Sequence, residues 1–383
     1  MKQGGAMAER VWRNYLRTKT RNPRFLWQMV FAILALGIFG GMIAQLWKAD
    51  PAEAGEVLAP PREAVAEVER LEALADAGAW GEVWWGLPTI VFHRMSNRGP
   101  LVLAALAGIC WLIFCVQAAQ VRGWRDPKLW LMLVAVGLGG LSVWPTHFFN
   151  MWQERRLGLV ETDELVGGIR FFVVSVGLRE ELAKLLCFVP LIPLLLLIRG
   201  DLIAMMTAGC VGLGFAFVEN VSYFHSSFGR DAVGRYLTAN PLHMALTGLA
   251  GLALYRAARD PKGWAPQALL VIGLVVLAHG LYDATIVIPA FGDLAILGSI
   301  LFALVVYQFF RELRELRPQQ VEVVSLTATF LAGVSLVTAA TFVYISSLMG
   351  FGPACDAMVM QVVSTSLMAY LFLREMPETM VTV

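Results

Sequence analysis

The chain has 383 residues, of which 58% are hydrophobic and only 15% are charged. This composition is typical of an integral membrane protein with several spans, and it excludes a soluble domain with one large core. The formal net charge of +1, without a long run of Lys or Arg, gives no indication of a nucleic-acid partner. All five cysteines lie in or beside apolar segments, so we interpret them as packing residues.

The first 24 residues are polar and basic and lack the apolar core of a cleaved signal peptide, so we expect a cytoplasmic tail. Beyond them, each membrane span needs roughly 20 mostly apolar residues. On that criterion the sequence predicts an all-α, polytopic transmembrane bundle with about ten spans. These cover residues 25–47, 100–119, 129–149, 168–198, 202–224, 240–257, 266–289, 293–310, 325–349 and 355–373. The fourth span is long enough to be tilted or broken at Pro190 and Pro193.

The segment 48–99 is the longest connection between the predicted spans. Apolar residues recur at helical spacing at Val65, Val68, Leu71, Leu74 and Ala75, and tryptophans follow at Trp80, Trp84 and Trp85. This pattern predicts a short amphipathic helix that lies on the outer leaflet, with an interfacial aromatic belt beside it.

Charge in the turns predicts the orientation of the bundle. The N-terminal tail and the turns "VRGWRDPK", "IRGD", "YRAARDPKG" and "RELRELRP" are basic, and with ten spans they all fall on one side. By the positive-inside rule that side is cytoplasmic, so both termini are expected in the cytoplasm. We divide the chain into a tail (1–24), N-terminal spans (25–164), a core (165–290) and accessory spans (291–383).

Polar side chains interrupt the fourth to seventh predicted spans. They are Arg179, Glu180, Glu181 and Lys184 in "GLREELAKL", Glu219 and Asn220 in "GFAFVENV", His243 in "NPLHMALTG", and His279 and Asp283 in "AHGLYD". One charged side chain at the bilayer centre costs roughly 2.5–3.5 kcal/mol, so these groups must be paired, hydrated or functional. We interpret Arg179 and Lys184 as ion-pair partners of the glutamates and Asn220 as an interhelical hydrogen-bonding residue.

The spacing of these polar residues predicts one shared site. A rise of 1.5 Å per helical residue, counted from the predicted span ends, places all of them between the mid-plane and the outer surface. His279 and Asp283 are four residues apart and share a helix face, as do Glu180 and Lys184. A carboxylate on the same face can orient an imidazole and fix its tautomer.

Several carboxylates and two histidines in an apolar, partly wet cavity suit hydrolysis. A carboxyl group there can take a proton from water and return it to a leaving group, and an imidazole can stabilise an oxyanion. The sequence contains neither the Gly-x-Ser-x-Gly pattern of serine hydrolases nor the His-Glu-x-x-His pattern of common zinc proteases.

Four motifs resemble, in order and spacing, those of the PrsW family of intramembrane proteases. They are "EELAK" with Glu180, Glu181 and Lys184, "FAFVEN" with Phe215 and Glu219, the lone His243, and "HGLYD" with His279 and Asp283. PrsW proteins are similar in turn to the CAAX prenyl proteases. The resemblance covers roughly residues 165–290 and implies a membrane-embedded endopeptidase. In PrsW relatives the substrate is a single-pass anti-sigma factor that is cut from the outer face.

The resemblance also implies roles for these residues. Glu180 would be the general base that activates water, Glu181 its partner and His243 an assisting residue. His279 and Asp283 would form the oxyanion side. Glu219 stands where the prenyl proteases have histidine, and Asp283 where they have asparagine, so their detailed assignments do not transfer directly. Lys184, Asn220 and Phe215 are expected to support the site.

Two alternatives remain open from the sequence. The same polar layer could form the relay of a proton-coupled transporter or channel, although we see no internal repeat. Within the hydrolase interpretation, we expect glutamate chemistry without a cofactor. The alternative is zinc held by His243, His279 and a carboxylate such as Glu219. We expect a bacterial cell membrane protein whose partners are the bilayer and a transmembrane substrate.

Overall fold

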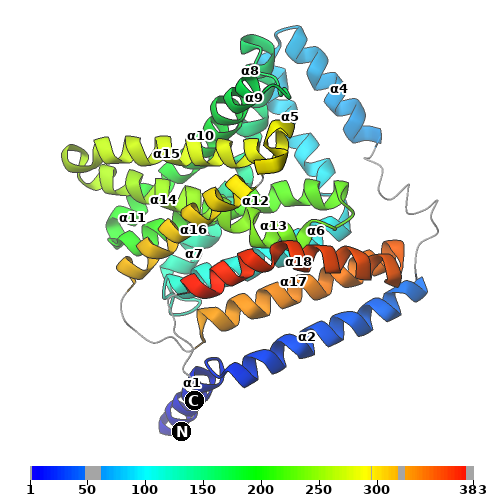
Figure 1. The fold of residues 1–383 in the computed structure, drawn as a ribbon. Coiled ribbons are helices and arrows are strands. Elements are labelled where there is room, and N and C mark those ends of the chain that lie inside the picture. The colour runs from blue at the N-terminus through cyan, green and yellow to red at the C-terminus, as the bar shows by residue number, and fades with distance from the viewer. Residues whose placement is uncertain (1, 48–61, 295, 318–323, 377–383) are drawn as a thin grey trace.

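The computed structural model describes residues 2–47, 62–294, 296–317 and 324–376. Over these ranges the chain is a bundle of helices without strands, as the sequence predicts (Figure 1). The predicted loop residues 48–61 lie outside the described part of the chain.

Nine helical segments within the described residues are long and apolar enough to cross a membrane, so the chain is an integral membrane protein. They are Pro23–Trp47 (α2 and η1), Arg98–Ala118 (α6), Pro127–Leu157 (α7 and α8), Leu165–Ile198 (α9 to α11), Asp201–Ser226 (α12), Pro261–Val287 (α15), Ile296–Leu316 (α16), Leu326–Met349 (α17) and Phe351–Glu375 (α18). Each corresponds to a predicted span. The remaining predicted span is α14 (Ala239–Arg259), which is not among the nine.

Helix α14 lies in the middle of the bundle, where it packs against α12, α15 and α16. Most of its residues are buried, including the polar Asn240, His243 and Thr247. Because its side chains face protein instead of lipid, this helix does not need the apolar surface that marks the other spans.

The long fourth span is broken into several pieces. It begins as α9 (Leu165–Arg170), continues as a π-helical segment, η2 (Phe171–Gly177), and returns to α-helix in α10 (Leu178–Phe188). The predicted break at the prolines is confirmed, since a 3₁₀ turn, η3 (Val189–Leu191), separates α10 from α11 (Ile192–Ile198). The π-helical segment comes immediately before the glutamate pair, and such segments are frequent at functional sites.

Glycines allow α12 to approach its neighbours closely. A Cβ on Gly214 would collide with the carbonyl oxygen of Val136 in α7, and one on Gly139 in α7 would collide with that of Val211. A Cβ on Gly212 would collide with the carbonyl oxygen of His243 in α14. The backbone contacts that position His243 therefore depend on small residues in α12.

The predicted amphipathic helix is present as α4 (Arg62–Asp76), but protein covers its apolar face. Leu71 and Ala75 are buried in a cluster with residues of α5 (Trp80–Arg94) and α8 (Val143–Leu157), including Trp144. The prediction that this face rests on lipid is wrong for these two residues. Val65 remains 42% exposed at the start of the helix.

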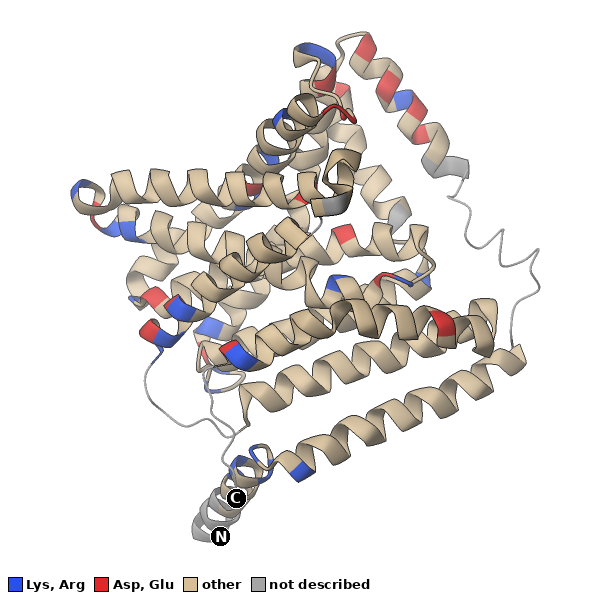
Figure 2. Ribbon diagram, in the orientation of Figure 1, with Lys and Arg blue, Asp and Glu red and all other residues tan. Residues whose placement is uncertain are grey.

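Charged residues gather at the helix ends, whereas the middles of most helices carry none (Figure 2). On one side of the bundle, Lys and Arg lie near α1 (Lys2–Lys19), around the α14–α15 turn and at the end of α16 (Figure 2). Helix α4, with several acidic residues, lies towards the opposite side (Figure 2). This distribution agrees with the sidedness of the basic turns, and the orientation in the cell stays a prediction.

Candidate functional site

A close helix approach brings the glutamate pair to His279. A Cβ on Gly177, at the end of the π-helical segment, would collide with the carbonyl oxygen of Val276 in α15. In return, a Cβ on Gly280 would collide with the carbonyl oxygen of Phe172. Since Gly280 follows His279 directly, this contact places the imidazole opposite α10.

Glu181 is fully buried and has three polar partners. Its Oε1 lies 2.7 Å from Lys184 Nζ and 2.7 Å from His279 Nδ1, and its Oε2 accepts a hydrogen bond of 3.2 Å from Thr247 Oγ1. Both carboxylate oxygens are thus satisfied inside the protein. The contact with Nδ1 fixes the orientation of the His279 ring and points Nε2 away from Glu181.

Lys184 is also fully buried and connects the glutamates to His243. Its Nζ lies 2.9 Å from His243 Nδ1, 3.6 Å from Glu180 Oε2 and 4.1 Å from the centroid of the Phe215 ring. An ammonium group only donates hydrogen bonds, so His243 Nδ1 accepts and the ring proton of a neutral His243 lies on Nε2. These contacts place Lys184 and Phe215 beside the other predicted site residues, and their supporting roles stay predictions.

Glu180 differs from its neighbour Glu181 because it has an unused oxygen. Its Oε2 is buried and makes no hydrogen bond, although it lies 3.6 Å from His279 Nε2. Asp283 Oδ2 lies 3.4 Å from the same Nε2, and the Asp283 side chain is 28% exposed. His279 Nε2 therefore faces two carboxylates, and the Asp283 carboxylate is more exposed than that of Glu180.

Glu219 belongs to a second polar group around His243. Its Oε2 lies 3.1 Å from His243 Nε2 and 2.6 Å from Arg235 Nη2. Arg235 belongs to the short helix α13 (Ala232–Leu237) and also donates to Asn220 Oδ1, while Asn220 Nδ2 donates to Asn240 Oδ1 over 2.7 Å. Asn220 thus makes the interhelical hydrogen bond that the sequence predicts.

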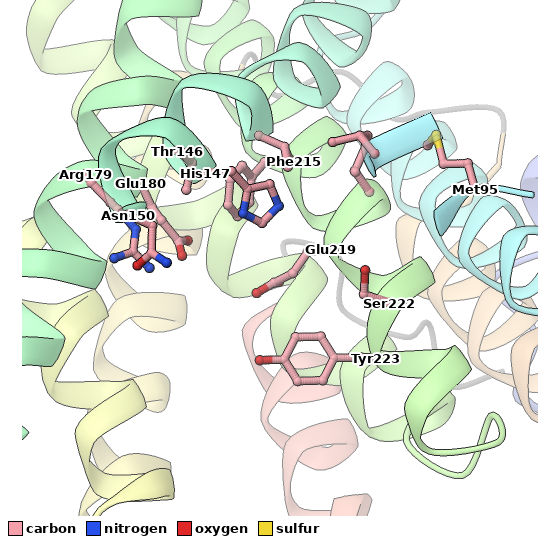
Figure 3. Close-up of a pocket in the computed structure, with 13 residues that line it drawn as sticks. Met95, Thr146, His147, Asn150, Arg179, Glu180, Phe215, Glu219, Ser222 and Tyr223 are labelled. Atoms are coloured by element: carbon pink, nitrogen blue, oxygen red, sulfur yellow. The ribbon is translucent and has the colours of Figure 1, made fainter. Parts of the chain in front are cut away.

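Two cavities meet at these residues. The larger has a volume of about 680 Å³ and is lined by Glu180, Glu219, His243, His279 and Asp283 together with residues of α13, α15 and α18. The smaller, of about 240 Å³, lies against α5, α8 and α12. Glu180 and Glu219 line both cavities, and Figure 3 shows their carboxylates pointing into the shared space. The larger cavity can therefore admit water and a peptide segment to the polar layer.

One group of side chains in the described residues has the composition of a metal site. Glu180, His243 and His279 each offer one ligand atom within 4.8 Å of the others. Two histidines and one carboxylate are a common set at catalytic zinc sites. The unpartnered Glu180 Oε2 and the arrangement in which Glu181 orients His279 fit such a site. The carboxylate in this group is Glu180, whereas the zinc alternative from the sequence named Glu219.

His243 fits this metal group only under one condition. Both its nitrogens have partners, Lys184 at Nδ1 and Glu219 at Nε2. A nitrogen must carry a free lone pair to bind a metal ion. His243 can therefore become a ligand through Nε2 if its ring proton moves to Nδ1 and Lys184 is neutral.

The structure brings every predicted site residue into one connected group, and it adds several that the sequence analysis missed. These are Thr247 on Glu181, Arg235 on Glu219, Asn240 on Asn220, and Tyr223, whose ring centroid lies 3.6 Å from the Arg235 guanidinium. Thr247 lies four residues after His243 on the same helix face, and this spacing could have identified it. Arg235 lies in a loop between predicted spans, where nothing in the sequence distinguished it.

Comparison with known proteins finds a match in the region of the chain that contains the predicted site. A family model described as "PrsW family intramembrane metalloprotease" matches residues 127–310, which include all the predicted site residues. No curated protein and no solved structure matches the chain. Residues 127–310, from α7 to α16, are therefore similar to the PrsW family of intramembrane metalloproteases.

Proposed function

We propose that this protein hydrolyses a peptide bond in a membrane-inserted substrate at the layer formed by Glu180, His243 and His279. One observation carries the proposal: a buried carboxylate oxygen, Glu180 Oε2, has no hydrogen-bond partner, faces His279 Nε2 and lines a large cavity. A buried oxygen without a partner loses free energy unless water, substrate or a cation reaches it. The similarity to a protease family supports hydrolysis over transport.

We propose that Glu180, His243 and His279 are the residues that hold the metal ion implied by the family. A zinc ion bound there would lower the pKa of water and polarise the scissile carbonyl. Glu180 then serves as a ligand, where the resemblance had implied a general base. Glu181 orients His279 through Nδ1, and Thr247 completes the hydrogen bonds of Glu181.

We assign the proton transfer to Asp283. Of the remaining carboxylates that line the cavity in this layer, Glu219 pairs with Arg235 and His243. Asp283 is 28% exposed and approaches His279 Nε2 at 3.4 Å. Asp283 can therefore accept a proton from the attacking water. It returns that proton to the leaving nitrogen when the peptide C–N bond breaks, while the hydroxyl remains on the carbonyl carbon.

The substrate that we propose is a single-pass membrane protein, with an anti-sigma factor as the class suggested by the resemblance. The site residues of α12 lie in the second half of that helix, and those of α14 lie near its start. Both therefore lie towards the end of the bundle away from the basic turns. With cytoplasmic termini in a bacterial cell membrane, cleavage is expected in the outer half of the bilayer.

A reconstituted cleavage assay with metal analysis tests this function. Wild type, Glu180→Gln and Asp283→Asn are compared on a single-pass membrane substrate, with Glu375→Gln as the control because Glu375 pairs with Arg314 at a distant helix end. We expect cleavage by wild type and Glu375→Gln only. Glu180→Gln should also lose bound zinc, whereas Asp283→Asn should retain it.

The outcomes separate the assigned roles. If wild type cleaves no membrane substrate, the proposed function is wrong. If Glu180→Gln abolishes cleavage but retains zinc, Glu180 acts as a general base and not as a ligand. If Asp283→Asn cleaves at the wild-type rate, the proton passes through another group.

A further inference from the structure

The last helix, α18, lies outside the part of the chain that matches the protease family, yet it forms a wall of the site cavity. Its buried residues Ala354, Met358, Thr365, Met368 and Phe372 recur at spacings of three and four and form the stripe that packs on the bundle. Gln361 occupies a position in this stripe, between Met358 and Thr365. It lines the larger cavity with Ser364 and Thr365.

Gln361 uses only one end of its amide. Its Oε1 accepts a hydrogen bond of 3.2 Å from the backbone N–H of Val233, in the first turn of α13. Its Nε2 is buried and has no partner. The bond to Val233 fixes the orientation of the amide, so the unused end is the donor. A buried donor without an acceptor loses free energy, and a ligand with an acceptor can offset that loss.

The same cavity is lined by the proposed proton-transfer residue, Asp283. Asp283, Ile286 and Val287 of α15 line it, and the side chain of Ile286 is 63% exposed on the outer surface of the bundle. The cavity therefore extends from the polar layer to the apolar surface between α15 and α18. A substrate helix in the bilayer can reach the site through this side.

A transmembrane helix satisfies its backbone groups internally, so its peptide bonds are inaccessible to water. Cleavage requires that the helix unwinds near the scissile bond, which frees carbonyl oxygens in an apolar environment. Each freed carbonyl needs a donor, because an unsatisfied backbone group costs several kcal/mol there. Gln361 Nε2 is a donor of the required kind in the cavity wall.

We propose that α18 is part of the substrate-binding site and that Gln361 Nε2 donates a hydrogen bond to a backbone carbonyl of the unwound substrate. This inference rests on the proposed function. It assigns a role in substrate recognition to α18, which lies outside residues 127–310, the part that matches the family model. Gln361 acts on binding, and the proposed bond-breaking groups belong to other helices, α10, α14 and α15.

Steady-state kinetics on the reconstituted full-length protein tests the inference. Gln361→Met keeps the volume and removes both polar ends, whereas Gln361→Glu keeps an oxygen for Val233 N–H and removes the amide donor. We expect both variants to raise KM roughly fivefold and to leave kcat within about twofold, since one neutral hydrogen bond is lost. Ser366→Ala is the matched control, because Ser366 is exposed on α18 and its hydroxyl bonds within the helix to Val363.

The results distinguish substrate binding from a structural role. An unchanged KM in both variants, with a wild type that cleaves, overturns this inference and leaves the proposed function intact. A defect in Gln361→Met alone, with a lowered unfolding temperature, shows that Gln361 only anchors α13. A wild type that cleaves nothing overturns the proposed function and this inference together.

Photo-crosslinking provides a readout that needs no turnover. A photoreactive residue at Ser364, which lines the cavity, is compared with the same residue at Ser366, in the Glu180→Gln background. We expect the substrate to crosslink at position 364 and not at 366. Equal crosslinking at both positions, or none at 364, contradicts a substrate site on this helix.

Discussion

The two sides of the His243–His279 pair differ in how their polar groups are satisfied. On the inner side, Glu181, Lys184 and Thr247 are fully buried and bonded to one another and to the histidines. On the cavity side, Glu180 Oε2 has no partner and Asp283 is partly exposed. Adjacent glutamates therefore have different surroundings. In the proposed function, the inner side stabilises and orients the site, and the cavity side is where water, metal and substrate would bind.

The largest expected effect comes from substitution of His279, which contacts Glu181 on the inner side and Glu180 and Asp283 on the cavity side. His279→Ala should lower kcat/KM about 1,000-fold, because the orienting carboxylate and the cavity carboxylates lose their common imidazole. His225→Ala is the control, since His225 bonds to Asn97 near a helix end. Both variants are assayed on the same membrane substrate. Equal losses would show that histidine removal acts through folding.

Glu181→Gln should weaken the inner side of the pair. In the metal-free protein, the substitution leaves the buried Lys184 ammonium without its closest anionic partner, which should cost about 3–5 kcal/mol of unfolding free energy. Unfolding in detergent measures this loss. Glu181→Gln/Lys184→Met removes both charges and should recover much of the stability. If the double variant is as unstable as the single one, the ion pair does not stabilise the site.

Metal removal should affect activity and leave the inner side intact. A chelator should reduce cleavage roughly 100-fold, and added zinc should restore it, because the ligand group lies at the cavity. The unfolding temperature should fall only by the amount that ligand binding contributes. Cleavage that is unaffected by a chelator, in protein shown to be free of metal, would contradict the proposed ligand group.

Gly212→Ala should displace the His243 backbone, because the new Cβ would meet the His243 carbonyl oxygen. Overpacking of this kind typically costs about 1–3 kcal/mol, and cleavage should fall with it. Gly137→Ala is the matched control, since a Cβ there meets no atom within 4 Å. Unfolding temperature and kcat/KM are measured for both. A Gly212→Ala variant that behaves like Gly137→Ala would show that α14 can shift without harm to the site.

The smallest effect is expected at Arg179, which lines the cavity and donates to Ser175 Oγ over 2.8 Å. Among the described residues, its guanidinium forms no ion pair with Glu180, the carboxylate of the metal group. Arg179→Ala should therefore change kcat/KM by no more than roughly threefold, as for the loss of a single peripheral hydrogen bond. A loss as large as that of His279→Ala would place Arg179 among the residues that act on the substrate.

The sequence predicted the spans and the site layer because both depend on local patterns. Apolar length identified nine of the spans, and the spacing of His279 and Asp283 placed them on one helix face. The break at Pro190 followed from the missing backbone donor of proline. These features need no knowledge of which helices are neighbours.

Other features depend on packing between distant segments, which one sequence does not reveal. The resemblance assigned different roles to Glu180 and Glu181, but the motif does not show which carboxylate has all its hydrogen bonds. That is determined by the positions of α15 and α14. Arg235 reaches the site from the short helix α13, and Gln361 reaches it from the last span. The apolar face of α4 is indistinguishable in sequence from one that faces lipid, yet it packs on α5 and α8.

The most direct test of the difference between the two sides is a paired measurement on Glu180→Gln and Glu181→Gln. For each variant, kcat/KM on a membrane substrate and the unfolding temperature are determined in the same preparation. We predict that Glu180→Gln loses cleavage and lowers the unfolding temperature no more than metal removal does. Glu181→Gln should lower cleavage as well, and it should lower the unfolding temperature further. Equal unfolding temperatures together with equal losses of cleavage would contradict the account, because the two glutamates would then act as one functional pair.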